Sequence, residues 1–279
     1  MFTILEKDNY IEIANLTNFD LGKIFDCGQA FRFDEDNGYF VGVAFGKLLK
    51  LKQPSLDKIT IIGITKQEFE SVFLKYFALD TDYNKIDEDI VCRMNNDQTI
   101  IKAIEYGKGI RLLRQDKWEA LCSFIISQNN NIPRIKKIIA NMSKQFGKHI
   151  EGEYYSFPTP EALYEAGVDK IFELKTGFRA KYIYDAAEKV ATGKINLDLV
   201  DTMTTQEATE YLMQIKGVGL KVASCALLFG FDKKDAFPVD VWVKRVLEKY
   251  YPNGLDISSL GDNAGMIQQY LFYYERYNK

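Results

Sequence analysis

The chain has 279 residues, of which 47% are hydrophobic and 27% charged, and its formal net charge is −3. This size and composition are ordinary for a globular protein with a large core, and we expect two domains. The absence of any run of 18 apolar residues argues against a membrane-spanning helix. The N-terminus lacks the basic region and cleavage site of a signal peptide, so we expect a cytoplasmic protein without membrane contact.

The cysteines and the single histidine limit the chemistry that is available. Cys27, Cys92, Cys122 and Cys225 are irregularly spaced, and two of them lie in apolar stretches. This pattern predicts reduced, buried thiols and neither a disulfide set nor a zinc or iron–sulfur site. His149 alone argues against His-based metal sites and Ser-His-Asp catalysis. Any chemistry must therefore rest on lysine, acidic, amide or arginine side chains.

The net charge does not identify the partner. A value of −3 argues weakly against nucleic acid, because DNA-binding domains are commonly basic. Lysines and arginines nevertheless cluster within residues 136–148 and 216–245, so binding to DNA stays open.

The first third of the chain is rich in predicted strands. Apolar and polar residues alternate over 9–16 and 30–53, and the second stretch contains turn signals at 36–38 and 45–47. A further strand is expected over 60–64 and a helix over 66–76.

From about residue 87 the apolar spacing lengthens to three and four, which is typical of amphipathic helices. Such helices are expected over 118–130, 132–147, 159–167, 180–193, 205–215 and 241–251. Glycines at 147, 167 and 193 are expected helix stops. The fold class is therefore α+β: an antiparallel sheet domain with helices over 1–110, then an all-α domain over 111–279.

The stretch KGVGLKVASCALLFG (216–230) raises the first functional question. Its glycines allow a tight turn that can approach a ligand, and the following helix points its first N–H groups toward an anion such as phosphate. Glycines that merely permit close packing of a helical hairpin explain the turn equally well. Lys221, however, lies in the first turn of an otherwise apolar helix, and burying an unpaired ammonium is costly.

Asp240 precedes the helix over 241–251 and can be its N-cap. An N-capping carboxylate is also held ionised by backbone N–H groups and by the helix dipole. A fixed anion some twenty residues from an isolated lysine suggests a paired site in which the amine acts as a nucleophile.

Three asparagines, Asn129 to Asn131, interrupt a helical pattern and are followed by Arg134. Asparagine disfavours helix and offers amide donors and acceptors. The stretch is therefore either a solvated turn or a recognition surface.

Several motifs in the same order resemble the 8-oxoguanine DNA glycosylase/AP lyase family of the helix-hairpin-helix superfamily, which carries a Gly/Pro-rich loop followed by an aspartate. The motifs are DCGQAFRF, YFALDTDY, GIRLLRQD, SQNNNIPRI, GFRAKY, KGVGLKVASC and FPVDV. The resemblance covers about residues 10–275. It implies a helical domain of two subdomains with the site in the cleft between them.

The resemblance also implies a role for each matching position. Lys221 and Asp240 fall on the catalytic lysine and aspartate. Four residues match positions of the family's damaged-base pocket. The carbonyl of Gly28 would accept the N7–H of 8-oxoguanine. Cys225 and Phe272 would contact the two faces of the base, and Gln268 its Watson–Crick edge. The opposite cytosine is read by Asn129, Arg134 and Arg179, with Phe178 beside it and Asn130 near the gap in the duplex. The backbone of Gly217, Val218 and Gly219 grips a phosphate, in this superfamily often with a structural K+ or Na+; no catalytic metal or other cofactor is implied.

The implied activity is excision of 8-oxoguanine opposite cytosine from double-stranded DNA, with base flipping, a lysine Schiff base and β-elimination, in base-excision repair. We expect a monomer, associated with the nucleoid if the source is prokaryotic. Two alternatives stay open: a monofunctional alkylpurine glycosylase, which would not need Lys221, and a non-catalytic helix-hairpin-helix module that binds DNA. Lys216, Trp242 and Phe178 depart from common family residues, which puts some contacts to DNA in doubt.

Overall fold

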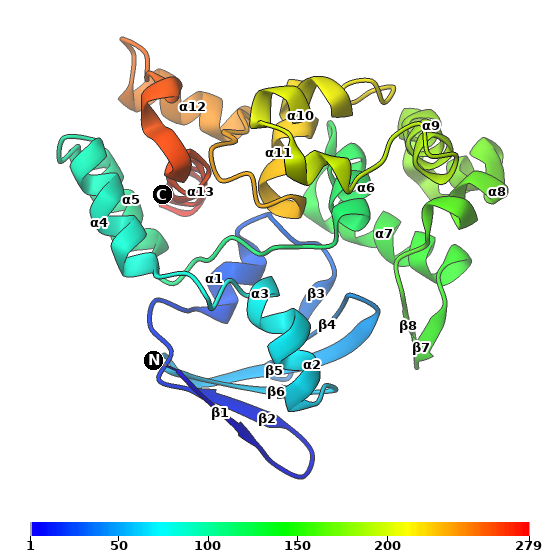
Figure 1. Cartoon of the computed structure of the whole chain (residues 1–279), viewed down its shortest axis with the longest axis horizontal. Helices are drawn as coiled ribbons and strands as arrows, with labels where there is room; N and C mark the ends of the chain where they lie inside the picture. The colour runs from blue at the N-terminus through cyan, green and yellow to red at the C-terminus, as the bar shows by residue number, and fades with distance from the viewer. Residues whose placement is uncertain (1, 279) are drawn as a thin grey trace.

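The computed structural model describes residues 2–278, which form a sheet domain followed by a mainly helical body (Figure 1). The sheet has six strands in the order β1-β2-β6-β5-β4-β3, and every neighbouring pair is antiparallel. The strands are β1 (Thr3–Glu6), β2 (Ile11–Ala14), β3 (Phe33–Asp36), β4 (Tyr39–Ala44), β5 (Lys47–Ser55) and β6 (Lys58–Ile62). The predicted α+β class is confirmed.

Two tight turns connect the three strands at one edge of the sheet, from β3 to β4 and from β4 to β5. Asn37 and Gly38 both have positive φ, 51° and 76°, and so do Phe45 and Gly46, at 49° and 70°. Turns of this kind match the right-handed twist of the strands they join. The turns predicted at 36–38 and 45–47 are thus confirmed, whereas no sequence pattern predicts β1 or the short helix α1 (Leu21–Asp26).

The predicted helix over 66–76 covers the inner face of the sheet. It consists of α2 (Lys66–Glu68), the π-helical η1 (Phe69–Phe73) and α3 (Leu74–Tyr76). Its buried aromatic rings pack on isoleucines and leucines that alternate along β2, β5 and β6. This alternation is the period-2 pattern of a sheet with one buried face.

The helical body contains a second core. Its helices are α4 (Tyr83–Arg93), α5 (Gln98–Gly107), α6 (Lys117–Ser127), α7 (Ile132–Phe146), α8 (Pro160–Ile171), α9 (Ala180–Ala191), α10 (Thr205–Leu212), α11 (Leu220–Gly230), α12 (Val241–Tyr250) and α13 (Ala264–Tyr277). Short elements between them are β7 (His149–Glu151), β8 (Tyr154–Tyr155), η2 (Phe172–Thr176), η3 (Gly177–Arg179), η4 (Leu199–Thr202) and η5 (Ile257–Asn263). Within residues 2–278, no helix is both long and apolar enough to cross a membrane.

The helices gather on two sides of the body. α8 and α9 pack on each other at one side, and α4, α5, α12 and α13 lie at the other, with α6 and α11 in contact between them (Figure 1). α5 precedes the domain boundary expected at residue 110, yet it packs against α13; the boundary stays a prediction. Gly167, expected as a helix stop, interrupts α8 with a φ of 79°, and helical backbone resumes after it.

A buried arginine joins the sheet domain to the helical body. Arg111 is 4% exposed. Its guanidinium donates to the backbone carbonyls of Thr17, Asn18 and Ala78 at 2.7 to 3.0 Å and lies 4.4 Å from the ring centroid of Tyr83. Carbonyl dipoles and an aromatic face thus replace the carboxylate that a buried cation usually requires.

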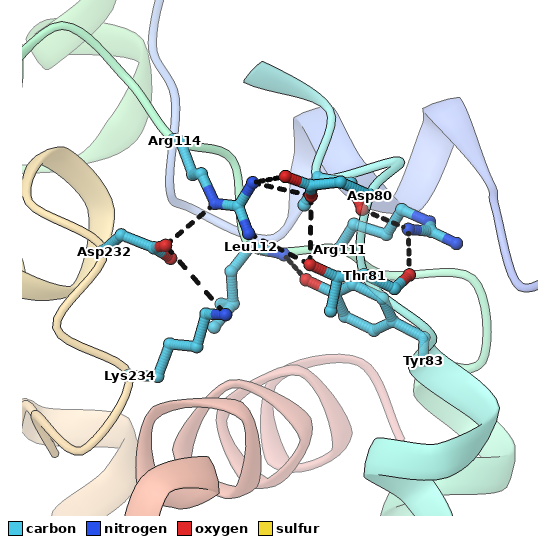
Figure 2. Close-up of polar contacts among 9 residues, drawn as sticks. Asp80, Thr81, Tyr83, Arg111, Leu112, Arg114, Asp232 and Lys234 are labelled. Atoms are coloured by element: carbon cyan, nitrogen blue, oxygen red, sulfur yellow. Dashed lines mark hydrogen bonds and ion pairs between the residues drawn. The ribbon is translucent and has the colours of Figure 1, made fainter. Parts of the chain in front are cut away.

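Nearby, Arg114 connects three segments of the chain (Figure 2). It forms two bonds to the Asp80 carboxylate, at 2.7 and 2.8 Å, and its Nε lies 2.9 Å from Asp232 Oδ2. Burial opposes the charge of Arg114, but hydrogen bonding to Asp80 and the charges of both carboxylates raise its pKa. Asp80 follows α3 and Asp232 follows α11, so the network ties the sheet domain to the segment that leads to Asp240.

We expect Arg114→Ala to lower the free energy of unfolding by roughly 1–3 kcal/mol, because it removes charge-assisted hydrogen bonds that are partly shielded from water. Arg114→Lys should recover part of this loss, since an ammonium can keep one of the two ion pairs. Urea unfolding measures both. Lys66→Ala is the matched control, because it removes an exposed i,i+4 pair with Glu70 at 3.9 Å and should cost under ~0.5 kcal/mol. Equal losses for Arg114→Ala and the control would contradict the expectation.

Candidate active site

A cavity of about 360 Å³ opens between α11, α13, the start of α12 and the loop after α6. This volume is in the usual range for a small-molecule site. Of the residues predicted for the site, Gly28, Asn130, Lys221, Cys225, Asp240, Gln268 and Phe272 line it. Residues that are separated by more than two hundred positions are therefore brought together.

Lys221 reaches this cavity from the first turn of α11, a helix buried on nearly all sides. Its Nζ donates to Ser127 Oγ at 3.2 Å and lies 5.6 Å from the ring centroid of Phe124. Within residues 2–278, Lys221 has no carboxylate oxygen within 4.0 Å. The amine is thus held in a pocket without an ion pair, where a ligand can meet it.

Asp240 is the N-cap of α12, as its position in the sequence predicts. Its Oδ1 accepts hydrogen bonds from the backbone N–H groups of Trp242 and Val243, both at 2.9 Å. These two bonds fix the orientation of the carboxyl group at the start of α12. The cap orients one carboxylate edge toward the helix and leaves the group at the wall of the cavity that holds Lys221.

Cys225 and Phe272 present apolar surface to the cavity. Cys225 follows Lys221 by one turn of α11, as expected for residues on the same face, and burial raises the pKa of its thiol. A neutral thiol and an aromatic ring are suited to contact the faces of a flat ring. Gly28 has a φ of +78°, and a Cβ there would lie 3.3 Å from Cζ of Phe272, so this position favours glycine.

Gln268 supplies an unsatisfied polar group in the same cavity. The residue is 4% exposed, and its Oε1 is buried without a hydrogen-bond partner among the described residues. A buried acceptor without a donor costs about 1–3 kcal/mol. The arrangement therefore favours a ligand with an N–H group. The adjacent Gln269 donates from Nε2 to the carbonyl of Cys27 at 2.6 Å, which fastens α13 beside Gly28.

The asparagine stretch forms a turn between α6 and α7. Asn129 has a φ of 46°, and Asn131 Oδ1 accepts the N–H of Arg134 as the N-cap of α7. Asn130 donates to the carbonyl of Ile126 at 3.1 Å. The solvated-turn alternative is thus correct as a description of local structure, while a recognition role stays a prediction.

The residues expected to read the opposite base lie outside the 360 Å³ cavity but close to one another. Arg179 is 3% exposed and donates to the carbonyls of Gln128 and Asn129, and its guanidinium lies 4.5 Å from the ring centroid of Phe178. Arg134 donates to the carbonyl of Lys175 at 3.2 Å. Phe178 is exposed. In this structure Arg179 supports the asparagine turn; its reading of cytosine stays a prediction.

The glycine hairpin differs from the expectation in one respect. α10 ends at Leu212, three residues before the expected end at Ile215, because the chain closes into tighter turns from Met213 onward. A Cβ on Gly217 would lie 2.3 Å from the ring of Tyr182, whereas one on Gly219 meets nothing within 4 Å. Close packing therefore explains Gly217, and Gly219 is open to a ligand.

A second, wider groove of about 670 Å³ runs from this hairpin to Asp240. It is lined by Gly219 and Lys221 at the start of α11, by Trp242 and Lys244 of α12, and by the asparagine turn. The N-termini of two helices thus face one groove, which favours an anion such as a phosphate backbone.

The sequence analysis did not predict Ser127, whose hydroxyl accepts a hydrogen bond from Lys221. A serine at the end of the otherwise apolar helix α6 was a signal that could have identified it.

Comparison with known proteins agrees with this geometry. Residues 12–121 match the model of the 8-oxoguanine DNA glycosylase N-terminal domain, and residues 122–257 match the HhH-GPD superfamily of base excision DNA repair proteins. The N-glycosylase/DNA lyase of Saccharomyces cerevisiae is 31% identical over 265 residues, which span 85% of this chain and 69% of that protein.

Solved structures give the same result. The 8-oxoguanine glycosylase/lyase of Clostridium acetobutylicum, in complex with double-stranded DNA containing cytosine opposite 8-oxoguanine, is 39% identical with a TM-score of 0.92, over 99% of this chain and 98% of that one. The 3-methyladenine DNA glycosylase of Archaeoglobus fulgidus has a TM-score of 0.75 over 96% and 99% of the two chains, but at 22% identity this likeness extends to the fold alone. The chain therefore belongs to the 8-oxoguanine N-glycosylase/DNA lyase family of the helix-hairpin-helix base-excision repair superfamily.

Proposed function

We propose that this chain is a bifunctional DNA glycosylase and AP lyase that excises 8-oxoguanine opposite cytosine from double-stranded DNA. The observation that carries the proposal is the Lys221 amine, which has no carboxylate partner and lies in a cavity whose wall also contains Asp240. A monofunctional glycosylase would activate water with the aspartate and would have no use for this amine.

The reaction begins with extrusion of the damaged nucleotide, which costs a few kcal/mol in unstacking and unpairing. The base enters between Cys225 and Phe272, and Gln268 accepts from its Watson–Crick edge. The Gly28 carbonyl accepts from N7–H, a proton that guanine lacks. On the duplex side, Asn129, Arg134 and Arg179 read the cytosine, Phe178 packs beside it, and Asn130 lies near the gap.

The chemical steps follow from the amine and the carboxylate. The Nζ of Lys221 gives up a proton and uses its lone pair to form a bond to C1′ as the bond from C1′ to the base breaks. The electron pair of that bond leaves with the base, which takes up a proton, and Asp240 stabilises the positive charge that develops on the sugar. The C1′–O4′ bond then breaks, O4′ takes one of the two protons on the nitrogen, and a protonated Schiff base between C1′ and Nζ remains. Removal of a proton from C2′ then breaks the C3′–O bond and expels the 3′ phosphate.

In this proposal, the hairpin backbone of Gly217, Val218 and Gly219 binds a neighbouring phosphate, and the same hairpin would hold a K+ or Na+ ion.

The protein acts as a monomer, because one chain supplies every residue that the mechanism uses. Its site of action is the cytoplasm, at the nucleoid in a prokaryotic cell, where DNA is accessible.

Borohydride trapping tests the proposal directly. With a duplex carrying one 8-oxoguanine opposite cytosine, we expect a covalent protein–DNA adduct and a cleaved strand; with guanine in the same place, we expect neither. Release of the base without an adduct would overturn the lyase assignment and favour a monofunctional glycosylase. A band shift with an intact base would favour a DNA-binding module. Placing adenine opposite the lesion should slow base release, which tests the reading of cytosine.

A further inference from the structure

A second cation lines the cavity, and the mechanism above does not use it. Arg276, near the end of α13, and Lys221 are the two cationic residues at its wall. The Arg276 guanidinium lies 5.8 Å from the ring centroid of Phe272 and 4.9 Å from that of Tyr277. Within residues 2–278, it has no carboxylate oxygen within 4.0 Å. Its donors are therefore not committed to an acid.

The position of Arg276 is fixed from two directions. A Cβ built on Gly28 would lie 3.6 Å from Nη1 of Arg276, so the guanidinium is next to the backbone of the base pocket. Tyr277, whose ring contacts the guanidinium, donates from its hydroxyl to the carbonyl of Asp26 at 3.0 Å. This bond holds the ring, and with it the arginine, beside the segment that contains Gly28.

The spacing along α13 places two different polar groups at opposite ends of one stacking surface. Gln268, Phe272 and Arg276 are four residues apart, so they share one face of the helix, and the outer two are separated by roughly 12 Å along its axis. All three line the cavity. A flat base stacked on Phe272 thus has one edge toward Gln268 and the other toward Arg276.

The side chains of Gln268 and Arg276 require different hydrogen-bond partners. The buried Oε1 of Gln268 needs an N–H donor, whereas a guanidinium has donors and no acceptor. The matching ligand is a purine with N–H groups on its Watson–Crick edge and an oxygen on its imidazole edge. Guanine has a C–H group at C8, but 8-oxoguanine has a carbonyl there.

We propose that Arg276 is a specificity-determining residue that donates a hydrogen bond to the C8 carbonyl oxygen of the extruded base. The inference rests on the proposed function and deepens it. Recognition then uses both changed positions of the oxidised base: the Gly28 carbonyl accepts from N7–H, and Arg276 donates to the adjacent oxygen.

The test compares three duplexes that the enzyme cannot cleave: one with 2′-fluoro-8-oxoguanine, one with 2′-fluoroguanine and one with tetrahydrofuran in place of the nucleoside. We expect Arg276→Ala to weaken binding of the first duplex by roughly 10- to 100-fold, which corresponds to a lost hydrogen bond to a charged group. Binding of the other two should change less than about twofold. Single-turnover base release from 8-oxoguanine should fall, while cleavage at a preformed abasic site should not.

Lys249→Ala is the matched control, because it removes an equal charge from the neighbouring helix α12, outside the cavity, where Lys249 pairs with Glu275 at 3.1 Å. It should leave the ratio of the three affinities unchanged. Arg276→Lys should restore part of the preference for 8-oxoguanine, since an ammonium keeps one donor. Thermal melting checks that each variant is folded.

Equal weakening on all three duplexes would overturn the inference and identify a phosphate contact. Unchanged binding and base release in Arg276→Ala would overturn it as well. Failure of the proposed function would give a different result. The wild-type protein would then form no borohydride adduct, whatever the behaviour of the Arg276 variants.

Discussion

Replacing Lys221 with glutamine is expected to abolish the borohydride adduct and strand cleavage, and to slow base release by roughly 10³-fold or more. An amide has no nucleophilic lone pair, so neither the bond to C1′ nor the Schiff base can form. The fold should tolerate the change, because a glutamine N–H can still reach Ser127, which Lys221 contacts at 3.2 Å. Single-turnover assays on 8-oxoguanine and abasic duplexes measure the two steps separately.

Lys170→Gln serves as the control, since it removes the same charge from an exposed position on α8 and should keep full activity. Affinity of Lys221→Gln for an abasic-analogue duplex should change by less than about fivefold, because the backbone contacts remain. Substantial adduct formation by the variant would show that a different amine is the nucleophile.

The second large effect is expected at Asp240, where two substitutions separate the structural role from the chemical one. Asparagine is as good an N-cap as aspartate, so Asp240→Asn should keep both bonds to the start of α12 and change stability by only a few tenths of a kcal/mol. Base release should nevertheless fall by roughly 10²–10³-fold, the usual cost of removing a group that stabilises developing charge. Alanine should lose the activity and also about 1 kcal/mol of stability.

Chemical unfolding and single-turnover base release on the same preparations give the comparison. If Asp240→Asn kept wild-type base release, the charge would be unimportant and Asp240 would be a cap alone. If the alanine and asparagine variants were equally destabilised, the assignment of the cap bonds to Oδ1 would be wrong.

Structural features that depend only on residues adjacent in the sequence, such as tight turns and helix caps, were predictable. The turn at Asn37-Gly38 requires two positive φ values, which these residues adopt readily, and Thr159 with Pro160 marks the start of α8 by cap chemistry. Asp240 as the cap of α12 belongs to the same class. The expected end of α10 at Ile215 was wrong because the apolar spacing continues through a turn that is no longer helical.

The cavity was predictable only in part. Lys221 and Asp240 stand out because each sits at the start of a helix in a sequence context that needs an explanation. Gly28, Gln268 and Phe272 were predicted only through the family resemblance. Apolar periodicity shows which face of a helix is buried, but it does not show which residues of other segments that face contacts. Arg276 had no local signal, because its significance arises from the approach of residues 26–28 to the last helix.

That approach has a consequence for the order in which the protein becomes active. The bonds from Gln269 to Cys27 and from Tyr277 to Asp26 join residues 242 and 251 positions apart. During synthesis, these two bonds cannot form until the last helix has left the ribosome. A nascent or truncated chain can therefore contain Lys221 and Asp240 and still lack the wall that selects the oxidised base.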